Sequence, residues 1–197
     1  MNGRKWSVVC AAALTLSAAV SVAAGEVLLV DDEGAKPEFT VGVLKNALGG
    51  TAVITANKEY VKEGNQAVQL AYKVSGKGDW NVVEYRARVL DRDFSKMEAV
   101  SLWIYGNNDP RIYLQLGFSG SDTGYFVYDI GPVNWTGWKK IVVPRGKFEY
   151  LGSFPDWENI EWLIVKANGE VAVNRGESKA EDSGTLYLDR VTRLDKK

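Results

Sequence analysis

The 197-residue chain contains no histidine, and its one cysteine is Cys10. A Ser-His-Asp triad and a histidine-based zinc site are therefore excluded, and no cysteine nucleophile lies beyond residue 10. Glycine-rich phosphate loops of the Walker or dinucleotide type are also missing from the sequence. The chemistry left to an enzyme is that of carboxylates or a lysine.

The sequence also has no internal repeat and no long amphipathic helical stretch. Its first residues combine Arg4 and Lys5 with an apolar run from Trp6 to Val22, followed by small residues. This run is too short for a membrane span, and the pattern is typical of a secretory signal peptide. We therefore predict a signal peptide at residues 1–24 and a secreted domain, periplasmic or extracellular, at residues 25–197.

The predicted mature segment has a small excess of negative charge. It retains 22 of the 24 basic residues and all 25 acidic ones, which gives a net charge of −3. An acidic exported domain without cysteine argues against nucleic acid as a partner, and nothing in it predicts membrane association after cleavage. A segment of this length is expected to form one domain.

Short runs rich in Val, Ile, Tyr, Trp and Leu alternate with turn signals such as Gly49-Gly50 and Gly131-Pro132. Many short strands at this spacing predict an all-β sandwich or barrel. The clearest expected strands are residues 67–74, 82–89, 100–106, 111–118, 125–130, 139–143, 162–167 and 185–191.

Strand alternation predicts one polar face. In residues 111–118 and 125–130, every second side chain is apolar and is expected in the core. The outward set, on two strands that should be neighbours, is Arg111, Tyr113, Gln115, Tyr125 and Asp129. A pyranose packs its C–H face on an aromatic ring while its hydroxyls need donors and acceptors, so this set suits a sugar.

Other interpretations of these side chains stay open. Tyr113 and Tyr125 can equally be cross-strand packing pairs without a ligand. Arg86 and Arg88 are expected in solvent or paired with Glu84. Among the tryptophans, Trp103 and Trp138 are expected to be core or sheet-packing residues, and Trp135 and Trp157 can flank a turn or cap the sandwich. Trp80, after a glycine-rich loop, is a candidate for stacking on a sugar.

Three segments carry a family resemblance: residues 93–106, 134–144 with its Trp-Thr-Gly-Trp turn, and 184–194 with its Leu-Tyr-Leu-Asp strand. They resemble the galactose-binding-like modules, in particular carbohydrate-binding modules similar to family 11. The resemblance implies a jelly-roll β-sandwich of two antiparallel sheets. It also implies a polysaccharide ligand, such as a β-glucan, on a concave sheet face.

The same resemblance implies a structural Ca²⁺ ion near the joined chain ends, held here by Asp31, Glu33 and Asp189. Hard oxygen ligands suit this cation. The sequence departs from the family pattern at this site, because the early aromatic residue is missing and Arg190 replaces a second aspartate.

Several functions remain compatible with the sequence. The first hypothesis is a non-catalytic polysaccharide-binding module. The second is a protein-interaction or self-associating subunit of an extracellular assembly, because aromatic residues and arginine also form protein interfaces. A glycosidase would need a carboxylate pair such as Glu84 and Asp129. Similarity to the complex I intermediate-associated proteins fits the fold pattern but not the export signal.

Overall fold

The computed structural model describes residues 25–30, 39–75, 81–120, 124–152, 156–169 and 181–196. The predicted signal peptide and the candidate residues Asp31, Glu33 and Trp80 lie outside these ranges. Within them the chain is all-β, as expected, and no helix is long and apolar enough to cross a membrane. The strands are β1 (Gly25–Leu28), β2 (Phe39–Lys45), β3 (Ala47–Thr55), β4 (Ala67–Ser75), β5 (Asn81–Arg88), β6 (Met97–Ser119), β7 (Gly124–Pro144), β8 (Glu149–Gly152), β9 (Trp162–Asn168) and β10 (Glu181–Asp195), with 3-10 turns η1 (Lys58–Tyr60) and η2 (Arg145–Lys147).

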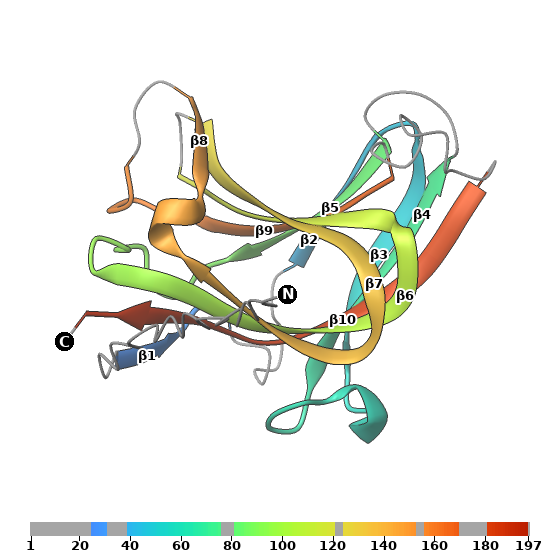
Figure 1. The fold of residues 1–197 in the computed structure, drawn as a ribbon, viewed down its shortest axis with the longest axis horizontal. Helices are drawn as coiled ribbons and strands as arrows, with labels where there is room; N and C mark the ends of the chain where they lie inside the picture. The colour runs from blue at the N-terminus through green and yellow to red at the C-terminus, as the bar shows by residue number, and fades with distance from the viewer. Residues whose placement is uncertain are drawn as a thin grey trace, which may run out of the picture.

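The two longest strands, β6 and β7, form one bent antiparallel hairpin that runs through both layers of the molecule. They pair along nearly their whole length, from Ala99 with Pro144 to Ser119 with Tyr125. Figure 1 shows both ribbons turning together at one side. The bend falls at register shifts between Asn107 and Tyr113, where bulges re-aim a strand. One hairpin therefore supplies strands to both sheets.

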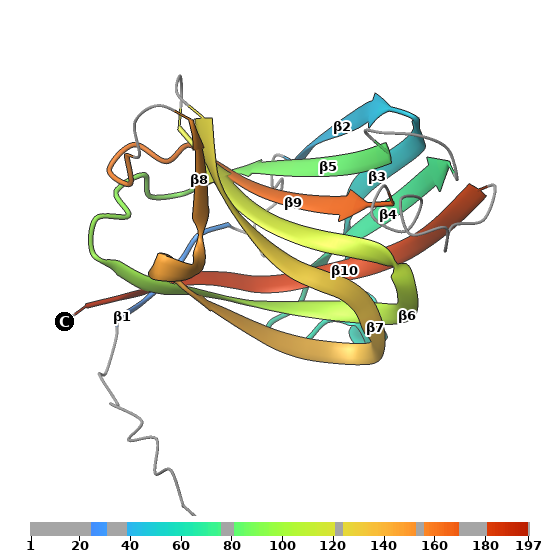
Figure 2. The same ribbon diagram turned by 45° about the horizontal axis from the view of Figure 1, so that its top comes forward.

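The bend in β6 divides the strand order β2-β5-β9-β6-β10-β4-β3 into two layers. In the layer that we name sheet I, the first part of β6 pairs with β10, which continues to β4 and β3. In sheet II, the second part of β6 pairs with β9, which continues to β5 and β2. β7 borders β6 in both layers, and β8 stands at the edge of sheet II (Figures 1 and 2). The architecture is the expected jelly-roll sandwich.

The core lies between the two sheets and is formed by alternate side chains of their strands. Both expected inward sets are confirmed: Ile112, Leu114, Leu116 and Phe118 are buried, and Phe126, Tyr128 and Ile130 belong to the core or pack against it. Trp157 closes one part of the core, stacking on Phe126 at a centroid distance of 3.6 Å. This tryptophan caps the sandwich as the sequence allowed.

Of the two roles expected for Trp103 and Trp138, the core role is wrong and the sheet-packing role fits, because both lie half-buried on the outer face of sheet I. Trp103 is paired across strands with Asp189, and its Nε1 donates to Glu63 at 3.1 Å. The ammonium of Lys62 lies 4.6 Å from the centre of its ring. Trp103 therefore fastens the segment around η1 to the sheet rather than filling the core.

Candidate functional site

The outer face of sheet II collects the predicted ligand residues. On β5 and β9, Val83, Tyr85, Leu163 and Val165 belong to the core cluster, so the alternating residues between them point outward. The register then forms rows across the strands. One row is Arg88, Trp162, Ser119, Tyr125 and Leu151, the next is Arg86, Ile164, Gly117, Val127 and Glu149, and the third is Glu84, Lys166, Gln115 and Asp129.

The ring of Tyr125 lies on this face beside Gly117. A Cβ on Gly117 would stand 3.7 Å from Cδ2 of Tyr125 and 2.9 Å from the carbonyl oxygen of Phe126. The ring reaches toward Lys166, whose ammonium lies 4.5 Å from the ring centre and 3.4 Å from the phenolic oxygen. The tyrosine is therefore held in place by contacts on the sheet, and it is a half-buried aromatic surface of the kind that a sugar ring packs on.

Gln115 and Asp129 form the polar part of the same face. They are cross-strand partners, and Nε2 of Gln115 donates to Oδ1 of Asp129 at 2.7 Å. Beside Asp129, a hollow of about 150 Å³ is lined by Val127, Tyr128, Asp129, Lys147 and Glu149. A hydroxyl group bound in this hollow could donate a hydrogen bond to the carboxylate of Asp129 and accept one from the amide of Gln115.

Lys166 contacts both Tyr125 and Glu84 on this face. This lysine was not among the residues predicted from the sequence. Glu84 is 6% exposed and accepts ion pairs from both sides, from Arg86 through one oxygen and from Lys166 through the other at 3.4 Å. The pairing of Arg86 with Glu84 was expected. The alternation of Trp162, Ile164 and Lys166 could have revealed the lysine, because its neighbours Val165 and Ala167 are apolar.

The register also bears on the possible carboxylate pair of Glu84 and Asp129. Their strands are three steps apart, in the order β5, β9, β6 and β7. Three strand spacings are roughly 14 Å, whereas paired glycosidase carboxylates stand roughly 5 to 9.5 Å apart. In addition, Glu84 is already occupied by two cations. The geometry does not suit these two residues for acid–base work on one glycosidic bond.

Tyr113 continues the face beyond Gln115. It is half-buried, and its cross-strand partners are Asn168 on β9 and Pro132 on β7. The structure therefore brings four of the predicted residues onto neighbouring strands of sheet II: Tyr113, Gln115, Tyr125 and Asp129.

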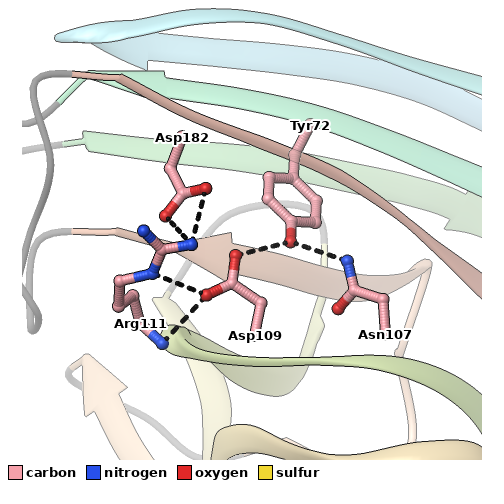
Figure 3. A network of polar contacts seen from close by, with 5 residues as sticks. All are labelled: Tyr72, Asn107, Asp109, Arg111 and Asp182. Carbon is pink, nitrogen blue, oxygen red and sulfur yellow. Dashed lines mark hydrogen bonds and ion pairs between the residues drawn. The ribbon is translucent and has the colours of Figure 1, made fainter.

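Arg111 is not part of this group, because the bend of β6 turns its guanidinium toward sheet I. Nε donates to Oδ1 of Asp109 at 2.9 Å, and Nη2 lies 2.8 Å from Oδ2 of Asp182 on β10 (Figure 3). The second oxygen of Asp109 accepts the hydroxyl of Tyr72 at 3.3 Å, and Tyr72 also accepts from Asn107. Arg111 thus ties the bend of β6 to sheet I, a role that alternation alone could not reveal.

The electrostatics of this network follow from its burial. The hydrogen bond with Asp109 raises the pKa of the Arg111 guanidinium, so the arginine stays charged. Desolvation and the neighbouring charge of Asp109 raise the pKa of Asp182 above its ordinary value, although Arg111 opposes this shift. Burial likewise raises the pKa of Tyr72, so it remains a neutral phenol that can donate a hydrogen bond.

Asp189, the one described member of the predicted calcium set, is buried and contacts backbone. Its Oδ2 accepts the N–H groups of Lys62 at 2.6 Å and Glu63 at 3.1 Å. Among the described residues, no group of three or more acidic, histidine or cysteine side chains could hold a metal ion. Asp189 therefore holds the segment after η1 against β10 through two hydrogen bonds to its backbone.

Comparison with known proteins identifies the family. The sequence matches the family model "Carbohydrate binding domain (family 11)" over residues 17–192. The chain belongs to this family. The expected resemblance is thereby confirmed, and the fold described above is that of a family 11 module. Comparison with curated proteins gives no match.

Solved structures of similar modules share the fold. The family 11 module of a cellulosomal cellulase of Clostridium thermocellum superposes with a TM-score of 0.62 and 19% identity, covering 87% of this chain and 95% of that one. A Clostridium thermocellum family 11 module in complex with a β-1,3-1,4-mixed-linked tetrasaccharide gives 0.60 and 19%, covering 88% and 97%. A family 30 carbohydrate-binding module gives 0.60 and 13%, covering 87% and 99%.

Proposed function

We propose that this family 11 module is a secreted, non-catalytic polysaccharide-binding domain whose ligand is a β-linked glucan. The observation that supports this most directly is the outer face of sheet II, where Tyr125 lies over Gly117 beside the hydrogen-bonded pair Gln115 and Asp129. An aromatic surface next to fixed polar groups matches the two kinds of surface on a pyranose. The solved family 11 module with a mixed-linked tetrasaccharide makes β-1,3-1,4-glucan the first ligand to test.

Binding without catalysis is proposed for a physical reason. Hydrolysis of a glycosidic bond needs two carboxyl groups at a fixed separation. On this face Glu84 is held by Arg86 and Lys166. Asp129 lies three strand spacings from Glu84 and accepts a hydrogen bond from its neighbour Gln115. These carboxylates are engaged in positioning the face and are not paired with each other.

A structural calcium ion and Trp80 complete the proposal. Asp31, Glu33 and Asp189 are the proposed ligands, with oxygen atoms of the type that Ca²⁺ prefers. Trp80 is proposed to stack on the glucan from a loop. For export, the proposal depends on the pattern of residues 1–24, and mass spectrometry of the secreted protein should give an N-terminus close to Gly25.

The experiment is isothermal titration calorimetry of residues 25–197 with mixed-linked β-glucan, comparing the unchanged protein with Tyr125→Ala and Tyr113→Ala. We expect a dissociation constant on the order of 10 to 100 µM and a weakening by about fivefold or more when an aromatic ring is lost. Tyr105→Ala, on the outer face of sheet I, is the matched control and should bind as the unchanged protein does.

The competing function is that of an assembly subunit. If both tyrosine variants retain glucan binding but lose self-association or a protein partner, that function replaces the present proposal. If the unchanged protein binds no soluble β-glucan at all, the proposed ligand is wrong.

A further inference from the structure

A second aromatic residue lies on the outer face of sheet II, in the same row as Tyr125. Trp162 is the cross-strand partner of Ser119, which in turn partners Tyr125. The two aromatic residues are therefore two strand spacings apart, roughly 10 Å. This separation corresponds to an oligosaccharide rather than to a single ring, so one chain running across the strands can contact both residues.

An arginine covers Trp162. The guanidinium carbon of Arg88 lies 4.9 Å from the centre of the Trp162 ring, and the two residues are cross-strand partners. Arg88 is exposed, and within the described part of the chain no carboxylate forms an ion pair with it. The contact with the ring holds the guanidinium near the sheet while its N–H groups are left without a described carboxylate partner, so they can bind a carboxylate of a ligand.

Charge is distributed unevenly over this face. On β5 and β9, the described outward side chains include three cations, Arg86, Arg88 and Lys166, and one carboxylate, Glu84. Glu84 already uses both oxygens, one for Arg86 and one for Lys166. On β7 and β8 the outward charges are acidic, Asp129 and Glu149. The β5–β9 end of the face therefore has excess positive charge beside the half-buried Trp162 and the exposed Arg88.

We infer that the Trp162–Arg88 pair is a subsite for an acidic sugar, so that this module prefers β-glucans whose chain bears carboxylate groups, as in uronic acids. The inference rests on the proposed function, because it places the acidic sugar at one end of a chain that also contacts Tyr125. Trp162 contributes ring contact and holds the arginine, and Arg88 donates paired hydrogen bonds to the carboxylate.

The test uses two ligands with one backbone: mixed-linked β-glucan, and the same polymer partly oxidised at C6 to the carboxylate. Calorimetry at low salt should give about fivefold tighter binding of the oxidised polymer, the equivalent of roughly 1 kcal/mol for a partly exposed charge pair. The preference should shrink as salt is added, because the ion pair is exposed.

Variants locate the effect. Arg88→Gln should remove the preference for the oxidised polymer, while Arg88→Lys should retain only part of it because lysine has no planar fork. Lys140→Gln removes the same charge from the outer face of sheet I and is the matched control, which should keep the full preference. Thermal melting of each variant checks that the fold is unchanged.

The outcomes separate this inference from the proposed function. Binding of the neutral polymer without any preference, or a preference that survives Arg88→Gln, overturns the inference and leaves the proposed function standing. Binding of neither polymer overturns both. Binding of the oxidised polymer alone, lost in Arg88→Gln, supports the acidic subsite and overturns the neutral glucan as ligand.

Discussion

Gln115 donates its side-chain amide to Asp129 at 2.7 Å across two adjacent strands, at a position where the residues face each other in register. The bond fixes the orientation of both groups before any ligand arrives. A fixed donor and acceptor lose less conformational entropy on binding than mobile side chains do. The pair is thus the most preorganised polar element of the outer face of sheet II.

Asp129→Ala should weaken glucan binding more than Gln115→Ala, because it removes the acceptor at the edge of the hollow and also leaves the amide of Gln115 without its partner. We expect a loss on the order of 1 kcal/mol or more of binding free energy. Calorimetry with mixed-linked glucan measures it. Equal, unchanged affinities in both variants would place the ligand elsewhere.

Gly117→Ala should strain the pairing of β6 with β7 next to Tyr125. The added Cβ would stand 2.9 Å from the carbonyl oxygen of Phe126, closer than carbon and oxygen normally approach. The expected cost is about 1 to 3 kcal/mol of unfolding free energy, together with weaker glucan binding. Gly49→Ala is the control, because no atom lies within 4 Å of its Cβ position. Urea denaturation of the two variants provides the comparison.

Trp103→Ala should loosen the segment after η1 without opening the core. The tryptophan is half-buried and contacts Glu63 and Lys62, so we expect a loss of about 1 to 2 kcal/mol of unfolding free energy. Phe118→Ala, at a fully buried position, should cost about 3 to 5 kcal/mol. Hydrogen exchange should show faster exchange at the amides of Lys62 and Glu63 in the first variant. If Trp103→Ala lost as much unfolding free energy as Phe118→Ala, the assignment of Trp103 to the outer face of sheet I would be wrong.

Asp182→Asn should stabilise the protein slightly at neutral pH. The raised pKa of Asp182 means that the folded state binds its proton more tightly than the unfolded state does. Its contribution to stability is therefore present at low pH and is lost as the pH rises through the folded-state pKa. We expect the asparagine variant to melt about 1 to 3 °C higher at pH 7, with the difference shrinking toward pH 4.

The control for this prediction is Asp109→Asn, which weakens an acceptor of both Arg111 and Tyr72 and should lower the melting temperature at pH 7. Scanning calorimetry between pH 4 and 8 separates the two variants. A lower melting temperature for Asp182→Asn across the whole range would mean that its charge stabilises the network.

Calcium, if bound by Asp31, Glu33 and Asp189, should raise the melting temperature, and a chelator should lower it. Selective binding to the folded state stabilises by roughly 2.7 kcal/mol at a hundredfold excess over the dissociation constant. Asp189→Asn should abolish this calcium dependence. Because Asp189 also accepts two backbone N–H groups, the variant should in addition melt lower in chelator. Identical melting curves of the unchanged protein with and without calcium would contradict the proposed calcium site.

The amino-acid sequence by itself determined the fold class, the eight clearest strand regions and which alternating residues of 111–118 and 125–130 face the core. Alternation on 111–118 and 125–130 was sufficient because a strand has only two faces, and apolar residues on one of them must be buried. The three family-like segments were likewise sufficient for the family. The pairing of β6 with β7 followed from the short connection between them.

Tertiary structure decided the rest. The turn signals at residues 106–110 and 131–132 are bends inside continuous strands, because pairing between β6 and β7 continues past the bulges on both sides. Strands β2 and β3 have weaker patterns, with glycines at 42, 49 and 50, and their pairing with β5 and β4 fixes them. Both the β6–β7 pairing beyond the bulges and the pairing of β2 and β3 with β5 and β4 join residues far apart in the sequence, so local sequence patterns do not reveal them.

Long-range contacts also explain why the positions of Arg111 and Trp103 do not follow from the sequence pattern alone. Alternation places Arg111 beside Tyr113, but two carboxylates, Asp109 at the bend of β6 and Asp182 on β10, determine where its guanidinium lies. Trp103 sits in an apolar strand, yet its outer face is covered by a segment 40 residues earlier, through Glu63. The position of a charged or aromatic side chain depends on the groups that pair with it or cover it. For Arg111 and Trp103 these groups include Asp182 and Glu63, which are far away in the sequence and adjacent only in the folded chain.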